Sequence, residues 1–434
     1  MNAIVGVSLL VLTPLLPLLL AFPALRSRLP QPCYIALLPA FILLLALPQG
    51  ASIDLPWLLL GSGLGIDSGV GRLLLAIAVL LWMVAAHLLH TAKDEPADDR
   101  VTSYYLLTLA GNLGTVLATD LVGFFTFSTL MGYGFYALLV VGGDEARWRA
   151  ARTYLVVLIV ADLMLFEAVL IAAAAAGGLH FEAVCQVVSQ STSPGLYLSM
   201  VLVGFALKAG IWPLHFWLLP LFRASRPAVA LLLGAVPIAT ALLGLVRWLP
   251  LGEISLPMLG LIIMGAGVAA MLYAILAGVR QAQLKMLPAY AAIFATGVFT
   301  TAMGAGLGDP DAWNRYADFA YLLIVSLGLG VALLVVSIGW LQARPYSPAM
   351  PEKQAADSAP WFECWLGAIA RWAVQMGVDT LPRLRAAWLA KVGALWQAAR
   401  AWHRALDGGE RFLQRWVCAV TLFLLLGIVV VFIA

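Results

Sequence analysis

Two ionisable side chains flank a proline inside one hydrophobic stretch. Lys208 lies about midway along an apolar segment that begins near Tyr197, and Pro213 and His215 follow it. A lysine at mid-membrane depth costs roughly 2.5–3.5 kcal/mol on insertion scales, so it needs a partner or a water-filled cavity. Pro213 predicts a helix break, because proline lacks the backbone N–H. His215 lies about two helical turns from Lys208, and an ionisable pair beside a broken helix indicates a site that moves a charge.

A carboxylate is the natural partner for a buried ammonium group. Asp162 and Glu167 both lie within the apolar run 151–176. Asp162 is about 11 residues from the inner end of its helix and Lys208 about 12 from the outer end of its own, so both lie ~16–18 Å deep. We therefore predict that Asp162 pairs with Lys208. Glu167 lies about 140° around the helix from Asp162, which favours a second wet pocket or a contact with another subunit.

Composition places these residues in a lipid bilayer. The chain is 63% hydrophobic and 11% charged, whereas soluble domains carry about 25% charged residues. The net charge of +3 gives no reason to expect nucleic acid as a partner. No phosphate-binding loop, nucleophile or cofactor motif is evident, so we expect no catalytic site and no cofactor in this chain.

Metal and disulfide chemistry are not indicated either. The cysteines are scattered without a Cys-x-x-Cys spacing, at Cys33, Cys185, Cys364 and Cys418. His87 and His90 are three residues apart, which is a spacing that can hold a metal, but no third ligand is evident nearby. The prediction is therefore no metal site and no disulfide framework.

Apolar runs of about 20 residues predict the membrane spans. About twelve are present, at 3–23, 32–48, 69–89, 102–119, 121–142, 151–176, 196–220, 227–248, 256–279, 287–305, 317–341 and 414–434. Lysine and arginine gather in alternate loops, which places those loops inside and both termini outside. Residues 1–23 have no basic start, so we expect a retained first span. The fold class predicted is an all-α polytopic membrane protein.

The stretch around Lys208 also resembles a known family. Lys208, Pro213, His215, Trp217 and Pro220 are similar to the Lys-x-x-x-x-Pro-x-His-x-Trp-Leu-Pro signature of the antiporter-like, proton-conducting subunits of respiratory complex I, with one extra residue before the last proline. Those subunits are related to Mrp cation/proton antiporters and to the membrane arms of energy-converting hydrogenases. Two further segments resemble the family, 109–138 with Asp120 and 280–293 with Lys285.

The resemblance implies an inverted-repeat bundle, and this chain departs from the pattern at its charges. Thr129 stands where the family has the glutamate that pairs with the lysine, and Leu233 and Ala239 stand at its eighth-helix histidine and lysine positions. The run 317–341 holds no acidic or basic residue beyond Asp318, and the family's second broken helix has no counterpart. We therefore expect an incomplete second repeat.

This interpretation divides the chain into six parts. They are the first three spans at 1–100, the first repeat at 101–250, the truncated second repeat at 251–342, a linker at 343–359, amphipathic lateral helices at 360–413 and a terminal anchor at 414–434. Tryptophan and arginine alternate through 360–413, which is typical of helices that lie in the inner interface. Some complex I subunits carry a similar lateral helix that straps neighbouring subunits together.

Three functions remain open from the sequence. The first is a proton- or cation-translocating subunit of a multi-subunit energy-coupling complex in the bacterial inner membrane, with Lys208 as the switching group, Asp162 setting its proton affinity and His215 relaying protons inward. The oxidoreductase chemistry would then lie on a soluble redox subunit. The second is the membrane subunit of a DAB-type inorganic-carbon uptake complex, with a soluble zinc-binding partner. The third is a scaffold that no longer transports and docks partner subunits.

Overall fold

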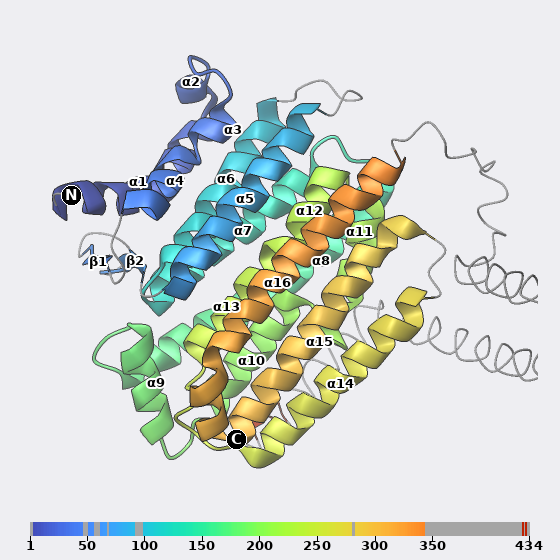
Figure 1. Cartoon of the computed structure of the whole chain (residues 1–434). Helices are drawn as coiled ribbons and strands as arrows, with labels where there is room; N and C mark the ends of the chain where they lie inside the picture. The colour runs from blue at the N-terminus through green and yellow to red at the C-terminus, as the bar shows by residue number, and fades with distance from the viewer. Residues whose placement is uncertain are drawn as a thin grey trace, which may run out of the picture.

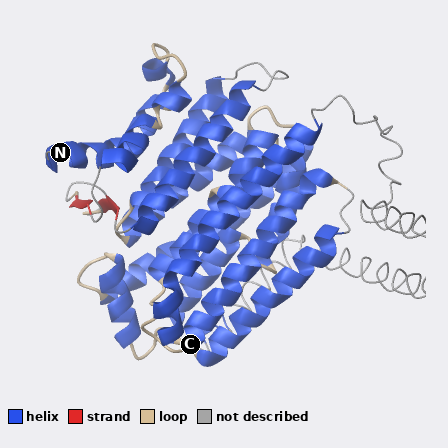
Figure 2. Ribbon diagram, in the orientation of Figure 1, coloured by secondary structure: helices blue, strands red, loops and turns tan. Residues whose placement is uncertain are grey.

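The computed structural model is a bundle of long helices with a group of shorter elements at one side (Figures 1 and 2). The structure describes residues 3–46, 51–55, 61–66, 69–91, 99–279 and 283–342, together with Ile428, Val430 and Val431. The predicted linker at 343–359 and the predicted lateral helices at 360–413 lie outside these residues. The same is true of the predicted anchor at 414–434, apart from the three residues just named.

The described helices and strands follow one another in this order: α1 (Ala3–Leu20), α2 (Pro23–Arg26), α3 (Pro32–Ile35), α4 (Leu38–Ala46), β1 (Ala51–Asp54), β2 (Gly63–Ile66), α5 (Gly69–Thr91), α6 (Asp99–Leu117), α7 (Leu121–Val140), α8 (Glu145–Ala175), α9 (Phe181–Gln190), α10 (Gly195–Ala209), the 3-10 helix η1 (Leu214–Trp217), α11 (Leu218–Ala224), α12 (Pro227–Ala235), α13 (Pro237–Trp248), α14 (Pro257–Val279), the 3-10 helix η2 (Leu284–Met286), α15 (Leu287–Gly308) and α16 (Pro310–Gln342).

Most of the predicted membrane spans coincide with these helices. Eight described segments are long and apolar enough to cross a membrane: Val70–Thr91, Leu121–Val140, Glu145–Ala175, Gly195–Ala224, Pro227–Trp248, Pro257–Val279, Leu284–Gly308 and Pro310–Gly339. Gly6–Leu20 and Pro32–Leu45 are shorter apolar helices, and α6 is not one of the eight. The chain is thus a multi-pass helical membrane protein, and the count of twelve spans stays a prediction.

A small hairpin corrects the all-α expectation. Strand β1 pairs antiparallel with β2, with Ala51 opposite Ile66 and Asp54 opposite Gly63; Figure 2 shows both strands beside the N-terminal helices. The sequence from Ala51 to Leu55 alternates apolar and polar residues, which is the period of a strand. The alternation covers only five residues and lies between long apolar runs, so the sequence did not predict a strand here.

Asp120 fastens this hairpin to the bundle. Its Oδ1 accepts a hydrogen bond of 2.8 Å from the backbone N–H of Gly123 and so caps the start of α7. Its Oδ2 accepts 2.8 Å from the N–H of Gly63, and the Ser62 hydroxyl donates to Oδ1 at 3.1 Å. A carboxylate at a helix N-cap is favourable because it satisfies a free N–H. Asp120 therefore has a structural part here, besides the family match that singled it out.

The helix that carries Lys208 breaks as predicted. The helix α10 ends at Ala209, and Gly210 follows with φ 63°, a left-handed conformation that glycine adopts without steric cost. The indole N–H of Trp217 donates 3.0 Å to the carbonyl of Leu207, which also accepts 3.2 Å from the backbone N–H of Gly210. The break thus begins three residues before Pro213 and continues through η1 to α11.

Arg26 joins the N-terminal helices to the bundle. Its side chain is only 4% exposed. Its Nε donates 2.9 Å to the carboxylate of Asp99, Nη1 donates to the Ser103 hydroxyl at 2.7 Å and to the Ala21 carbonyl at 2.9 Å, and Nη2 donates to the Asp99 carbonyl at 2.7 Å. The guanidinium therefore closes the region between α2 and the start of α6.

We expect Arg26→Ala to destabilise the chain by about 2 kcal/mol, because the hydrogen bonds that a buried, charged guanidinium donates are lost. Thermal unfolding of the purified chain in detergent measures this. Arg28→Ala is the matched control, since Arg28 is exposed two residues away, and it should change stability by less than about 0.5 kcal/mol. Equal effects of the two substitutions would contradict the role of Arg26 in joining α2 to α6.

In the second half, α14 and α15 pack with their backbones almost in contact. A Cβ at Gly260 would lie 2.5 Å from the carbonyl oxygen of Gly304, and one at Gly267 would lie 2.6 Å from that of Gly297. Small residues at such crossings are typical of membrane helices. This packing fixes α14 against α15 and sets the positions of the side chains that both helices direct at the broken helix.

Candidate functional site

Lys208 contacts side chains from two other helices. Its Nζ lies 2.7 Å from Oδ1 of Asp162 on α8 and donates a hydrogen bond of 2.9 Å to the Ser128 hydroxyl on α7. The two charged side chains are 7% and 8% exposed. Among the described residues, no hydrogen-bond donor reaches Oδ2 of Asp162. The contact between Lys208 and Asp162 that the sequence predicts is therefore present, and each charge neutralises the other.

A close approach of α8 and α10 brings the pair together. Gly204 lies one turn before Lys208, and a Cβ there would meet the Leu165 side chain at 2.9 Å and the carbonyl of Ala161 at 3.3 Å. Ala161 immediately precedes Asp162. A larger residue at 204 would therefore push α10 away from α8 and stretch the ion pair.

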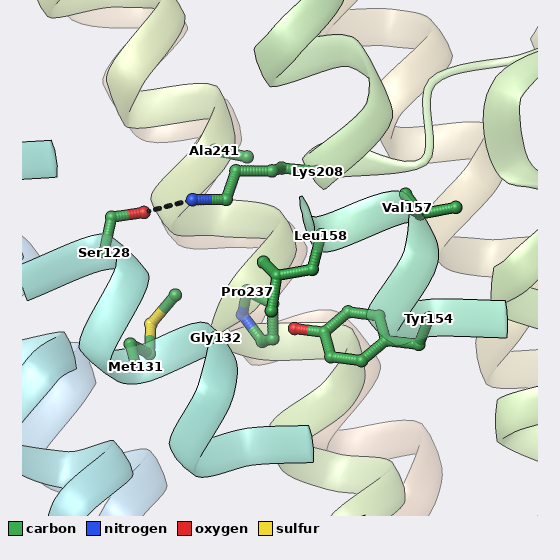
Figure 3. A pocket seen from close by; sticks show the side chains of 9 residues that line it. All are labelled: Ser128, Met131, Gly132, Tyr154, Val157, Leu158, Lys208, Pro237 and Ala241. Carbon is green, nitrogen blue, oxygen red and sulfur yellow. Dashed lines mark hydrogen bonds between the residues drawn. The ribbon is translucent and has the colours of Figure 1, made fainter. Parts of the chain in front are cut away.

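A small cavity adjoins the Lys208 side chain (Figure 3). Its volume is about 10 Å³, which is room for about one water. It is lined by Ser128, Met131, Gly132, Tyr154, Val157, Leu158, Lys208, Pro237 and Ala241. Figure 3 shows the Tyr154 hydroxyl pointing toward this group of residues. The lining combines an ammonium and two hydroxyls in otherwise apolar surroundings, which is a place where one water could accept a proton.

His215 is buried on the broken helix. Its side chain is 1% exposed, and neither ring nitrogen has a hydrogen-bond partner among the described residues. Its ring packs against Tyr273 of α14, with the centroids 4.9 Å apart. The structure thus places His215 on the broken helix but does not join it to Lys208 by a hydrogen bond. A buried imidazole left unpaired is unfavourable, so such a group calls for an explanation beyond packing.

A large polar cavity lies near the same aromatic residues, at the end of the bundle where α8 begins and α11 ends. Its volume is about 580 Å³, and exposed Asp144, Arg149 and Arg223 stand around it. Tyr290 of α15 lines it and lies 6.4 Å, centroid to centroid, from Tyr273. Two tyrosine rings therefore stand between this cavity and the imidazole of His215.

The other predicted residues lie apart from the ion pair. Glu167 is exposed on the outside of α8. Lys285 is exposed in η2 and donates 3.3 Å to the carbonyl of Arg223 at the end of α11. Asp120 caps α7. Of the predicted ionisable residues, then, the structure brings together Lys208 and Asp162, and among the described residues no hydrogen bond or ion pair joins the other four to them.

The part of the chain that the structure describes contains no group of three or more histidine, cysteine, aspartate or glutamate side chains that could hold a metal ion. His87 and His90 lie on α5, and no third ligand of these types joins them within the described residues.

Comparison with known families decides the class of the protein. The family described as NADH:quinone oxidoreductase/Mrp antiporter, TM matches residues 118–339, which is half of the chain and includes Ser128, Asp162, Lys208 and His215. The chain belongs to this family. It is an antiporter-like membrane subunit, and the resemblance seen in the sequence is confirmed.

Individual relatives are more distant. The chain is 26% identical over 278 residues to an NADH-quinone oxidoreductase subunit of Thioalkalivibrio sulfidiphilus, covering 62% of this chain and 58% of that one. It is 27% identical over 190 residues to a Na⁺/H⁺ antiporter subunit of Bacillus subtilis, covering 43% and 38%. The chain thus spans about half the length of the curated relatives it matches.

Solved structures share the fold. The Mrp complex from Dietzia sp. has a chain that matches with a TM-score of 0.66 and 17% identity, covering 80% of this chain and 38% of that one. A chain of the archaeal membrane-bound sulfane sulfur reductase matches with a TM-score of 0.63 and 17% identity, covering 78% and 71%. At this identity the likeness concerns the fold alone.

The carboxylate beside Lys208 comes from α8 and not from α7, where the resemblance in the sequence predicts an acid. Thr129, which the sequence resemblance matches to the family's glutamate, has a buried hydroxyl without a hydrogen-bond partner among the described residues. The preceding residue, Ser128, takes the bond to Lys208 instead. Asp162 supplies the carboxylate from α8.

Uncharged groups surround the two other departures from the pattern. Leu233 is fully buried, and Ala239 lines a cavity of about 40 Å³ together with Asn112 and Thr240. Asn112 donates 3.2 Å to the Thr240 hydroxyl and accepts 2.9 Å from the indole N–H of Trp82. An amide and a hydroxyl therefore lie beside Ala239, which the sequence resemblance matches to a lysine of the family.

Sequence reasoning missed Ser128, Asn112 and Thr240. Each is a neutral polar residue in an apolar run, and such residues are common in membrane helices. For Ser128 a signal existed, because it precedes the family's acid position. For Asn112 and Thr240, the contact between α6 and α13 depends on tertiary packing that no local pattern encodes.

Proposed function

We propose that this chain translocates protons, or another small cation, as the antiporter-like membrane subunit of a multi-subunit energy-coupling complex. The single observation that carries the proposal is the buried Lys208–Asp162 ion pair beside a water-sized cavity. Charged side chains inside membrane helices are costly and mark ion pathways. The reaction that drives the transport would lie on another subunit.

The pair can act as a switch because its two protonation states are coupled. While Asp162 is ionised, it stabilises the ammonium of Lys208, 2.7 Å away. A proton taken up by the carboxylate removes that attraction, and a buried lysine without its counter-ion releases a proton more readily. The Ser128 hydroxyl, 2.9 Å from Nζ, can bond an ammonium as an acceptor and a neutral amine as a donor. The titration is therefore a property of the pair rather than of one residue.

The route to the inner side would run through His215. Its two unpartnered nitrogens can take up and release a proton at different atoms. Tyr273 and Tyr290 stand between it and the large inner cavity, and tyrosine hydroxyls both donate and accept hydrogen bonds. We infer that protons pass from this cavity by way of these hydroxyls and intervening water.

The finer architecture belongs to the same proposal. We infer about twelve spans in an inverted-repeat arrangement whose second repeat, 251–342, is incomplete, with both termini outside the bacterial inner membrane. The segment 360–413 would strap the chain to neighbouring membrane subunits. A soluble redox subunit would complete such a complex.

Two other functions are less favoured. A transport-inactive scaffold has no use for a buried ion pair, because apolar residues of similar size often stabilise a fold as well or better. A carbon-uptake complex with a zinc-binding partner shares the fold class, but the relatives described above are named as subunits of an NADH-quinone oxidoreductase and of a Na⁺/H⁺ antiporter. These names favour an energy-coupling complex.

Purification of the tagged full chain from its native membranes in mild detergent tests the proposal. We expect mass spectrometry to find other membrane subunits in fixed ratio, and the purified complex in liposomes to carry cations or protons across the membrane. A zinc-binding soluble partner would support the carbon-uptake function. A chain that purifies alone, with no ion movement in liposomes, would refute the proposed function.

A further inference from the structure

One face of α8 points away from the bundle and carries a stripe of large apolar side chains. Leu163 is 61% exposed, and the spacing along the stripe alternates between three and four residues. Its members are Val156, Ile159, Leu163, Phe166 and Leu170. This spacing is the repeat of a helix that packs lengthwise against another helix.

Glu167 lies within this stripe and is exposed. It follows Leu163 by four residues and precedes Leu170 by three, so all three share one face. It is eight residues before the end of α8 at Ala175, about 12 Å along the helix axis. The other charged residues of α8, apart from Asp162, lie at or before Arg152. The apolar part 153–175 therefore spans the hydrocarbon core of about 30 Å, and the Glu167 carboxylate lies within it. Acidic side chains at that depth are rare toward lipid and normally face a partner or water.

We propose that this face of α8 is a subunit interface, and that its occupant is a transmembrane helix of a different subunit that presents a lysine or arginine to Glu167. The inference rests on the proposed function only in requiring that the chain belong to a complex. The apolar stripe supplies the packing surface, and the carboxylate supplies the charge that selects the neighbour.

The helix α14 has an exposed face without a charged residue, which serves as a comparison. It also exposes large apolar side chains, among them Leu261 and Leu272 at 60% and 56%. Its sequence from Pro257 to Val279 holds no charged residue. A face of that composition suits lipid, whereas the face with Glu167 does not. The two helices α8 and α14 are therefore similarly exposed, and they differ in that only the exposed face of α8 carries a charge.

The partner of Asp162 does not also neutralise Glu167. Asp162 faces inward and is neutralised by Lys208, whereas Glu167 faces outward. A second copy of this chain is a poor occupant, because a symmetric contact through this face would set two Glu167 carboxylates against each other. Like charges at close range oppose ionisation. The occupant therefore has to bring the opposite charge.

Site-specific photo-crosslinking in native membranes tests the neighbour. A benzophenone amino acid replaces Leu163 in the full chain, and the matched control carries it at Leu272 on α14, which is similarly exposed. We expect the label at 163 to attach to a transmembrane segment of another subunit that contains a lysine or arginine. Its protein-crosslink yield should exceed that of the control about tenfold, as a close contact at one face requires. Crosslinks to a second copy of this chain, or to lipid only, would overturn the proposal.

The charge is tested separately. Glu167→Leu should lower the amount of the crosslinked neighbour that co-purifies with the chain by about tenfold or more, since an interfacial charge would lose its partner. Glu167→Asp should retain most of it. Glu182→Leu, which removes an exposed acid on α9, is the control and should leave it unchanged. An unchanged neighbour in Glu167→Leu would overturn the inference.

The outcomes distinguish this inference from the proposed function. If the complex purifies and carries ions but the label at 163 finds no neighbouring subunit, only the interface on α8 is wrong. If the unaltered chain purifies without any other subunit, the complex itself is refuted and this inference falls with it.

Discussion

Lys208→Ala is expected to reduce ion translocation by the reconstituted complex at least about tenfold, which corresponds to a loss of about 1.4 kcal/mol or more at the transport barrier. The substitution removes the ammonium that contacts both Asp162 and Ser128. Asp162 then remains in apolar surroundings without its counter-ion, so the coupled pair that would exchange the proton no longer exists. Dye quenching or an ion electrode, with the complex in liposomes, measures the rate.

Lys285→Ala is the matched control for this experiment. Lys285 is also a family-matched lysine, but it is exposed and makes one hydrogen bond, to the carbonyl of Arg223. Its loss should leave the transport rate within about twofold of the unaltered complex, as is usual for surface substitutions. The amounts of co-purified subunits must match in all samples. An unchanged rate for Lys208→Ala in an intact complex would support the scaffold function instead.

The depth argument found the ion pair from sequence alone. Helical rise is constant, so counting residues from the membrane surfaces placed Asp162 and Lys208 at one level, and the structure has them 2.7 Å apart. The same geometry placed Glu167 on a different face of its helix. Rise and periodicity are local properties, which is why these features could be predicted without knowledge of the packing.

Features that depend on which helices meet could not be predicted in this way. His215 packs on Tyr273, which lies 58 residues further along the chain, and no local pattern relates the two. Ser128 contacts Lys208 because of the rotation of α7 about its axis, and that rotation is set by neighbouring helices rather than by its own sequence. The hairpin of β1 and β2 is held partly by the carboxylate of Asp120, which accepts a hydrogen bond from Gly63 and lies 57 residues further along the chain.

The second large effect concerns stability, and it separates the cost of the ion pair from its use. Removing one partner of a buried ion pair leaves an uncompensated charge, so Asp162→Leu should destabilise the purified chain by about 3–5 kcal/mol. Lys208→Met should do the same. The double variant Asp162→Leu/Lys208→Met removes both charges and fills the site with apolar atoms, so its loss should be well below the sum of the two single losses. Thermal unfolding in detergent gives all three values.

In the double variant, stability and transport should respond differently. If the pair serves to move a charge, the double variant recovers most of the lost stability while translocation stays at the level of Lys208→Ala. If the pair served only to hold α8 against α10, the double variant would recover stability and function together. If the double variant instead lost as much stability as the two single variants together, the 2.7 Å contact between Nζ and Oδ1 would contribute no coupling energy. The switch assigned to Lys208 and Asp162 would then be wrong.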